Sequence, residues 1–444
     1  MAFVNNSTDC SRLYVDDIYA GIMPFAMVSD AVPAIVTSDS PIHPEITLTN
    51  PGETAVDGDV TVTVTCGDES QTETLRGVNI AAGELGRFTL QSVITPHNNR
   101  TVPYTITISD GETEASTSGE ITALVNRVVC EEMTGMWCGY CVRGIVAMEE
   151  MNRKYPDTFI GMAVHQGDAL AVDAYLPIFS FSSEGLPYMV MMRSRDSRGD
   201  PRQISSYYSY IIDRQPTVGV GVTARTDADT RMVKATATLM FANDFSDLNY
   251  RLAWLITENN VCHPGDSEYY QTNNYAGGEL GEMGGFENLS KRLSGDEIKF
   301  QDVPRGFAFD AYGGIENSVP TEGKALESIE SPVEFALPDN IDNLGECRLT
   351  CLVLDGDGKI VNAARVPLLG EPDGLTEAVA DNSGAHFSAV DGGLAATGLA
   401  GEAARVYRAD GQLAALITAD GMTQLPAGFY IVACGGQSTK LIIK

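Results

Sequence analysis

The sequence has few basic residues and no long apolar run. Its 444 residues include 29 Lys and Arg against 60 Asp and Glu, which leaves a net charge of −31. A surface of this charge repels nucleic acid and anionic lipid, so we expect neither as a partner. No apolar run is as long as a membrane span, and Met1 to Cys10 lack the charged and apolar parts of a signal peptide. We therefore expect no membrane span, and a native chain that continues upstream of Met1.

The cysteines lack the regular spacing of a disulfide framework. There are nine, an odd number, and only two of them form a C-x-x-C pair. No second C-x-x-C and no His pair lies near that pair, which argues against a zinc site. We expect most of the other cysteines, including Cys130, to be small buried side chains. We predict no metal and no organic cofactor.

The C-x-x-C pair, Cys138 and Cys141, stands where an extended run becomes a helix. Apolar residues between 123 and 129 predict a buried strand, and apolar residues at helical spacing predict a helix over 142–151. A cysteine at a helix N-terminus is favoured as a thiolate because of the helix dipole. The second cysteine, one turn later, can attack a mixed disulfide formed at the first. Glu132 would project from the strand beneath the pair as a candidate base.

The Trp-Cys-Gly-Tyr-Cys motif after a strand and before a helix resembles the thioredoxin superfamily, and Glu132 holds the place of that family's buried acid. The Gly-Tyr dipeptide is similar to that of periplasmic disulfide isomerases. The wider run from Val128 to Gly144 resembles the outer membrane protein twenty-eight family, cell-surface thioredoxin-like proteins of Gram-negative anaerobes. The resemblance covers roughly residues 126–370. A disulfide that is only structural stays the alternative interpretation of the pair.

The resemblance also implies a substrate groove. Pro187 opens a predicted strand where thioredoxin folds carry a cis-proline, which would bring the Leu186 backbone against the cysteines. An ordinary trans-proline at a strand start is the alternative. Trp137, Gly139 and Tyr140 complete the expected groove. His165, just after a strand, is interpreted as a solvated residue and is not assigned to the site.

The rest of the chain indicates a multidomain, mainly β protein. Alternating strands punctuated by turns predict an immunoglobulin-like β-sandwich before the thioredoxin-like α/β domain, and a second β-sandwich and a small C-terminal β-sandwich after it. The predicted limits are 1–25 for an N-terminal segment that ends an upstream module, 26–124, 125–216, 217–370, 371–384 for a linker, and 385–444.

A long polar insertion interrupts the second sandwich between residues 259 and 317. It contains Tyr269, Tyr270 and Tyr275 and many glycines. Loops of this length are uncommon and are usually functional or mobile. The tyrosines would contact a partner protein or fix the loop onto the sandwich, and we favour the second interpretation.

The C-terminal segment carries a Leu-Pro-Ala-Gly-Phe-Tyr-Ile-Val run at 425–432 and a final strand that ends in Lys444. These features resemble the C-terminal sorting domain that is read by the type IX secretion system. The resemblance implies export across the outer membrane followed by anchoring at the surface.

Together these patterns predict an extracytoplasmic thiol–disulfide oxidoreductase or isomerase, secreted or at the cell surface. It would act on extracellular protein or peptide thiols and disulfides and exchange electrons with an unidentified redox partner. The alternative is a non-catalytic surface binding or adhesion protein that uses a thioredoxin-like scaffold, because a fold alone does not establish activity.

Overall fold

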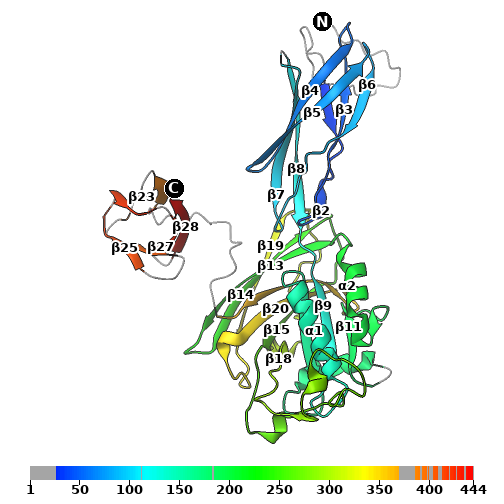
Figure 1. Ribbon diagram of the computed structural model, residues 1–444, viewed down its shortest axis with the longest axis vertical. Coiled ribbons are helices and arrows are strands. Elements are labelled where there is room, and N and C mark those ends of the chain that lie inside the picture. Colours follow the sequence, from blue (N-terminus) through cyan, green and yellow to red (C-terminus); the bar gives the residue numbers. More distant parts are fainter. Residues whose placement is uncertain are drawn as a thin grey trace. The chain divides into compact units, whose positions relative to one another are not determined.

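Strands dominate the computed structural model, which confirms the prediction of a mainly β protein with several sheets (Figure 1). The chain divides into two compact units, Met1–Gly374 and Leu375–Lys444. The structure describes residues 27–111, 113–182, 185–369, 386–390, 393–397, 399, 404–408, 413–419, 421–426, 428–434 and 437–443. The predicted N-terminal segment and the predicted linker lie outside the described residues.

The first β-sandwich consists of two sheets with the strand orders β1-β3-β6 and β2-β8-β7-β4-β5. Buried and exposed residues alternate along its strands, as in β4, where Val60, Val62 and Val64 point into the common core. One face of each sheet is therefore exposed to solvent. The strands are β1 (Met27–Asp30), β2 (Ile35–Thr37), β3 (Glu45–Thr49), β4 (Val56–Cys66), β5 (Glu69–Ile80), β6 (Leu85–Thr89), β7 (Thr101–Ser109) and β8 (Glu114–Leu124).

The apolar run before the cysteines forms two strands rather than the single predicted one. β8 ends at Leu124 in the first sandwich, and β9 (Val128–Thr134) begins the next sheet. Asn126 lies between them and is buried. Its side-chain amide donates hydrogen bonds to the carbonyl oxygens of Ile211, Ile212 and Arg214. The chain therefore changes sheets at a polar residue whose amide is satisfied by the end of a distant helix.

The part of the chain from Val128 to Ile212 contains a four-stranded sheet with the order β10-β9-β11-β12. β9 pairs in parallel with β10 and antiparallel with β11. β12, at the edge of the sheet, is only two residues long. The elements are α1 (Val142–Lys154), β10 (Phe159–His165), the 3-10 helix η1 (Asp173–Phe181), β11 (Tyr188–Met191), β12 (Arg198–Gly199), the 3-10 helix η2 (Pro201–Gln203) and α2 (Ile204–Ile212).

The two α-helices cover one face of this sheet. Gly144 of α1 lies over Glu132 of β9. Tyr155, at the end of α1, stacks on Tyr208 of α2 with ring centroids 4.2 Å apart. The other face of the sheet is covered by η1 and by the second sandwich, because Tyr175 of η1 lies 4.8 Å from Phe307 between ring centroids.

The second β-sandwich has the strand orders β13-β14-β19 and β18-β15-β20-β21. β20 and β21 form a hairpin, in which the N–H of Asp355 donates to the carbonyl oxygen of Lys359. The strands are β13 (Val218–Asp227), β14 (Met232–Phe241), β15 (Arg251–Glu258), β18 (Val303–Phe307), β19 (Ser328–Ala336), β20 (Cys347–Leu354) and β21 (Ile360–Pro367).

The sheet that contains β15 and β20 is buried on both faces. Trp254 and Ile256 of β15 belong to the core of the sandwich, whereas Ala253 and Leu255 belong to the core that includes β9 and β10. A strand with two buried faces needs apolar residues at successive positions, which explains the continuous run from Leu252 to Ile256. The second sandwich thus supplies one of the two layers that cover the sheet β10-β9-β11-β12.

The insertion leaves the second sandwich after β15 and returns at β18. It contains the short elements η3 (Ser267–Tyr269), β16 (Gln271–Thr272), η4 (Phe286–Asn288) and β17 (Arg292–Leu293). Its ends meet at an isolated bridge between Val261 and Phe300. The predicted end at residue 317 is too late, since β18 already pairs with β15. Proline and glycine are uncommon inside strands, so Pro304 and Gly306 made the residues of β18 resemble a loop in the sequence.

The C-terminal unit contains the strand orders β22-β23-β26 and β25-β24-β27-β28 around a small apolar core. All its pairings within the described residues are antiparallel. Its strands are β22 (His386–Val390), β23 (Gly393–Thr397), β24 (Ala404–Arg408), β25 (Leu413–Ile417), β26 (Gly421–Gln424), β27 (Gly428–Cys434) and β28 (Gln437–Ile443).

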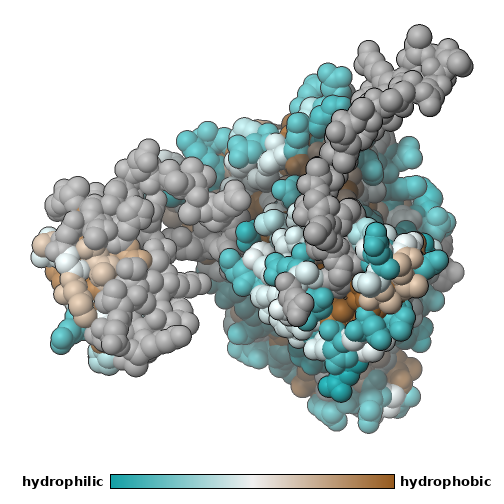
Figure 2. Space-filling view, turned by 90° about the horizontal axis from the view of Figure 1, so that it is seen from above, coloured by the Kyte–Doolittle hydropathy of each residue, from teal (hydrophilic) through white to brown (hydrophobic). Residues whose placement is uncertain are grey.

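The surface is largely polar, in keeping with the net charge of −31. On the face shown in Figure 2 the described residues are mostly hydrophilic, and apolar residues occupy small separate areas. In the part of the chain that the structure describes, no helix has both the length and the apolar character needed to cross a membrane.

Candidate active site

The two cysteines of the C-x-x-C pair form a disulfide in the turn between β9 and α1, and their Cα atoms are 5.4 Å apart. Cys138 keeps 6 % of its surface exposed, whereas Cys141 is completely buried. An external thiol or disulfide therefore reaches Cys138 first. The other cysteines that the structure describes as free are Cys66, Cys130, Cys262, Cys347 and Cys351.

The helix begins after the pair. Val142 is the first residue of α1, and Cys141 is its N-cap residue, without a side-chain cap hydrogen bond. Cys138 therefore precedes the helix by one turn instead of starting it as predicted. The sulfur of Cys138 is nevertheless bonded to the sulfur of the N-cap residue. It lies at the end of the helix where the backbone dipole favours a negative charge.

Glu132 lies beneath the first turn of α1 with 1 % of its surface exposed. Its Oε1 atom is buried and has no hydrogen-bond partner among the described residues. Burial raises the pKa of this carboxyl to about 8, against the opposing effects of a hydrogen bond from Thr134 and of the positive charge of Arg143. Glu132 is thus a buried acid that changes its protonation state near neutral pH.

A small cavity lies beside this carboxyl. Its volume is about 20 Å³, roughly the space that one water molecule occupies. It is lined by Glu132, Thr134, Ile145, Met148, Glu149, Ala163, His165, Gln271, Phe300 and Gln301. Two of these residues, Glu149 and Gln301, are at least partly exposed, so the cavity lies near the protein surface.

His165 is one of the residues that line this cavity, and the prediction of a solvated histidine is wrong. Only 3 % of its surface is exposed, and its Nδ1 lies 2.8 Å from Oδ2 of Asp168. Its ring meets that of Phe300 edge to face. The histidine is buried because the insertion, which carries Phe300, covers the end of β10.

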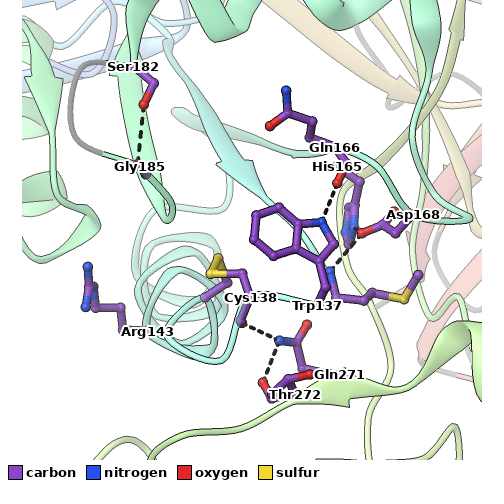
Figure 3. The surroundings of a disulfide bond; sticks show 12 residues. Trp137, Cys138, Arg143, His165, Gln166, Asp168, Ser182, Gly185, Gln271 and Thr272 are labelled. Atoms are coloured by element: carbon purple, nitrogen blue, oxygen red, sulfur yellow. Dashed lines mark hydrogen bonds and ion pairs between the residues drawn. A yellow bond between two sulfur atoms is a disulfide. The ribbon is translucent and has the colours of Figure 1, made fainter.

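The loop after β10 holds the turn that leads to the cysteines. Oδ2 of Asp168 accepts a hydrogen bond from the N–H of Met136 at 2.7 Å. Burial alone would raise the pKa of the Asp168 carboxyl, but hydrogen bonds from His165 and from the N–H groups of Met136 and Leu170 lower it overall. The indole N–H of Trp137 donates to the carbonyl oxygen of Gln166 at 2.6 Å. Figure 3 shows the indole fixed in this way beside Cys138.

Two exposed aromatic side chains flank the disulfide. Trp137 is 56 % exposed and Tyr140 is 47 % exposed, whereas Gly139 between the cysteines is buried. Large apolar side chains at the surface beside a reactive group form a natural contact area for a polypeptide. These are the three residues that the sequence assigned to the groove on the cysteine side.

The peptide bond between Leu186 and Pro187 is cis, which confirms that part of the prediction. Tyr188, the next residue, pairs with Met133 of β9. The Leu186–Pro187 loop therefore lies at the same end of the sheet as the turn that carries the cysteines. Leu186 is partly buried against the core of this part of the chain.

A positive charge lies close to the pair on α1. Nη2 of Arg143 forms an ion pair with Asp200 at 2.9 Å, and its guanidinium carbon lies 6.0 Å from the ring centroid of Tyr140. Nε of Arg143 is buried and makes no hydrogen bond within the described chain. In Figure 3 Arg143 and Gln271 lie on different sides of Cys138.

The insertion reaches the cysteine turn from the other side. The N–H of Thr272 donates to the carbonyl oxygen of Met136 at 2.8 Å, and the N–H of Asn274 donates to that of Gly139 at 2.9 Å. The side-chain amide of Gln271 donates to the carbonyl oxygen of Cys138 at 3.0 Å. The expectation that the insertion's tyrosines fix it to the sandwich is not met by Tyr275, whose ring meets that of Tyr140 edge to face.

Sequence reasoning missed Arg143, His165, Asp168 and Gln271. Local patterns carry no signal for Gln271, because more than a hundred residues separate it from the cysteines. His165 and Asp168 are three residues apart at a strand end, a spacing that allows their pairing but does not require it. Among the described residues, no three His, Cys, Asp or Glu side chains gather so that they could hold a metal ion.

No family model matches this chain, and no curated protein matches it. Among solved structures, HBP35 of Porphyromonas gingivalis is similar with a TM-score of 0.41 and 16 % identity, covering 72 % of this chain and 99 % of that chain. The CARDB domain of the PF1109 protein from Pyrococcus furiosus gives a TM-score of 0.19 at 15 % identity, covering 24 % and 99 %. Red sea bream transglutaminase gives 0.19 at 7 % identity, covering 78 % and 31 %. The functional assignment therefore rests on the site itself.

Proposed function

We propose that this chain is a thiol–disulfide oxidoreductase that acts on protein or peptide substrates through Cys138 and Cys141. The observation that carries the proposal is the asymmetry of the pair above a buried acid. Cys138 keeps 6 % of its surface exposed, Cys141 is fully buried, and burial raises the pKa of Glu132 beneath them to about 8. A disulfide that serves only stability needs neither the asymmetry nor the acid.

Reduction of a substrate proceeds in two exchanges. The Cys138 thiolate attacks one sulfur of the substrate disulfide, so that a mixed disulfide forms and the second substrate sulfur leaves as a thiolate and takes up a proton. Cys141 then gives its proton to ionised Glu132 and attacks the sulfur of Cys138. The first substrate sulfur, which was bonded to Cys138 in the mixed disulfide, leaves as a thiolate and is protonated. The substrate gains two electrons and two protons, and the protein pair becomes a disulfide.

The same steps run backwards when the pair oxidises a substrate dithiol. Which direction dominates depends on the reduction potential of the pair and on the dithiol or disulfide protein that resets it. We propose that Trp137, Gly139 and Tyr140 form one wall of the substrate groove and that Leu186 and Pro187 form the other. A substrate strand would hydrogen-bond to the backbone of Leu186.

We further propose that the protein works outside the cytoplasm, at the cell surface or secreted, and that the C-terminal module directs its export. This proposal is supported by the sequence resemblances at 128–144 and 425–432. It predicts that removal of residues 385–444 stops export in a host that has a type IX secretion system. Surface digestion of intact cells with a protease measures that outcome.

The activity is tested by alkylating the reduced protein across pH and mapping the modified cysteines by mass spectrometry. We expect Cys138 to react with a midpoint well below the value of about 8.5 for a free thiol. Cys66 is the internal control, since burial and the neighbouring Glu69 raise the pKa of its thiol. Cys138→Ser removes the fast reaction, and Cys141→Ser traps a mixed disulfide with a peptide disulfide.

The opposite result would favour a different class of function. If Cys138 reacts no faster than Cys66 and no mixed disulfide accumulates in Cys141→Ser, the pair is a structural disulfide. The chain would then be a surface binding or adhesion protein built on a thioredoxin-like scaffold.

A further inference from the structure

The segment Gln271–Tyr275 of the insertion runs alongside the cysteine turn and holds it at three carbonyl oxygens. Met136 and Gly139 accept from backbone N–H groups of the segment, and Cys138 accepts from the side chain of Gln271. Figure 3 shows Gln271 and Thr272 directly beside Cys138. A segment that follows β15 thus forms part of the site that follows β9.

Gln271 is the residue of this segment that touches a cysteine. It is 1 % exposed, and its amide nitrogen donates both to the carbonyl oxygen of Cys138 at 3.0 Å and to that of Thr272 at 2.8 Å. The Cys138 oxygen also accepts from the N–H of Cys141 at 3.1 Å. The peptide group of Cys138 is therefore held by two donors, one from its own turn and one from the insertion.

Gly139 supports the same close approach. A Cβ atom at this position would collide with the side-chain amide of Asn274. The backbone of Gly139 does not have the positive φ that reserves other positions of this chain for glycine. The glycine in the C-x-x-C motif is thus explained by the insertion that lies against it.

We propose that Gln271 is a positioning residue for thiol–disulfide exchange at Cys138, an inference that rests on the function proposed above. When the disulfide is reduced, the bond that kept the two sulfurs together is gone. A turn whose central carbonyl is held from both sides keeps them close, which raises the effective concentration of one thiol toward the other. This favours the disulfide over the dithiol and speeds the attack of Cys141 on a mixed disulfide at Cys138.

The test measures the equilibrium of the full chain with reduced and oxidised glutathione. Two molecules of reduced glutathione convert the disulfide into the dithiol and become one molecule of oxidised glutathione. We expect Gln271→Met to lower the equilibrium constant for disulfide formation about threefold to tenfold, which corresponds to a reduction potential about 15–30 mV more oxidising. Release of glutathione from the mixed disulfide by Cys141 should slow by a similar factor.

Asn50→Leu is the matched control. Asn50 is also 1 % exposed, and its amide donates to the carbonyl oxygens of Thr54 and Ile80 in the first sandwich, away from the cysteine turn. Both variants replace one buried amide by an apolar side chain. A shift in Gln271→Met that is absent in Asn50→Leu supports the proposal. An unchanged constant in Gln271→Met, or equal shifts in both variants, overturns it.

A second pair of variants decides the matter if Gln271→Met fails to fold. Gly139→Ala should push the segment away from the turn and lower the equilibrium constant. Adding Asn274→Ala removes the atoms nearest to the new methyl group and should restore the constant. Absence of restoration contradicts the proposal. If the unmodified pair does not exchange with glutathione at all, the proposed function itself fails, a result distinct from normal exchange that Gln271 does not influence.

Discussion

The two faces of β9 carry neighbouring glutamates with opposite surroundings. Glu131 and Glu132 expose 0 % and 1 % of their surface. Glu131 points toward η1 and the second sandwich, where Arg193 donates from Nε at 3.1 Å and from Nη2 at 3.0 Å and the Tyr175 hydroxyl donates at 2.7 Å. Glu132 points toward α1 and leaves one oxygen without a partner in the described chain.

The difference separates a structural carboxyl from a reactive one. The guanidinium of Arg193 compensates the charge of Glu131 and lies 3.8 Å from the ring centroid of Tyr312. Burial, and to a smaller extent the nearby charge of Glu131, raise the pKa of the Tyr175 hydroxyl. The hydroxyl therefore keeps its proton and donates a hydrogen bond. Glu132 has no such arrangement, and its proton leaves near neutral pH. A buried acid becomes useful for proton transfer where its counter-charge is incomplete.

The largest effect on the free energy of unfolding should come from removing the counter-charge of Glu131. Arg193→Met leaves Glu131 buried without its cation, and we expect the free energy of unfolding to fall by about 3–5 kcal/mol. Urea denaturation at pH 7 measures the change. The exposed pair of Lys324 and Asp244 is the control, since Lys324→Met should leave stability nearly unchanged. A loss no greater than that of the control would show that the buried pair contributes little.

Local sequence patterns predicted the parts of this site that one stretch of chain determines. The strand–turn–helix around Cys138 is read from neighbouring residues, whereas the cis peptide bond before Pro187 was implied by the resemblance to a known family. Composition and alternation were sufficient for the mainly β architecture. These features depend on backbone preferences and on the burial of one face of each element.

The missing parts depend on tertiary contacts. The sequence did not reveal that Arg193 would pair with Glu131, since the two are 62 residues apart. The sequence also did not place Gln271 at the cysteine turn. It predicted a solvated His165 because Phe300, which covers this histidine, lies in the insertion between β15 and β18. Polar residues in a loop give no periodic signal, so their partners become visible only when the sheets are assembled.

A smaller effect on the free energy of unfolding should come from Glu132, on the other face of β9, and it should depend on pH. Between pH 4.5 and about 8 the folded chain keeps the proton on Glu132, while the unfolded chain has lost it. Folding then binds a proton, so stability must fall as the pH rises through this window. We expect Glu132→Gln to remove this slope, which amounts to about 3 kcal/mol between pH 5 and pH 8.

The measurement is a series of urea denaturations of the oxidised protein at pH 5, 6, 7 and 8. Glu150→Gln is the control because it removes an exposed carboxylate from the same helix. The contrast between the two faces would be lost if Glu132→Gln kept the pH slope of the unmodified chain. Glu132 would then be compensated as completely as Glu131.

The smallest effect tests how closely the unpaired acid lies under α1. In an ordinary helix interior, alanine is more stable than glycine by about 1 kcal/mol. At Gly144 the opposite should hold, because a Cβ atom would collide with the Glu132 carboxyl group, whose carbon would be 2.7 Å away. Gly144→Ala should therefore lower the free energy of unfolding by about 2 kcal/mol.

A double-mutant cycle attributes this loss to the contact with Glu132. In a Glu132→Ala background the carboxyl group is absent, so Gly144→Ala should become neutral or slightly stabilising, with a coupling energy of about 2 kcal/mol between the two sites. If Gly144→Ala costs the same in both backgrounds, the helix is disturbed for another reason. If it stabilises the chain that still carries Glu132, the acid can withdraw from the helix. Either result would mean that Glu132 is not confined beneath the cysteines. The contrast with Glu131, which its counter-charge Arg193 holds on the opposite face of β9, would then no longer hold.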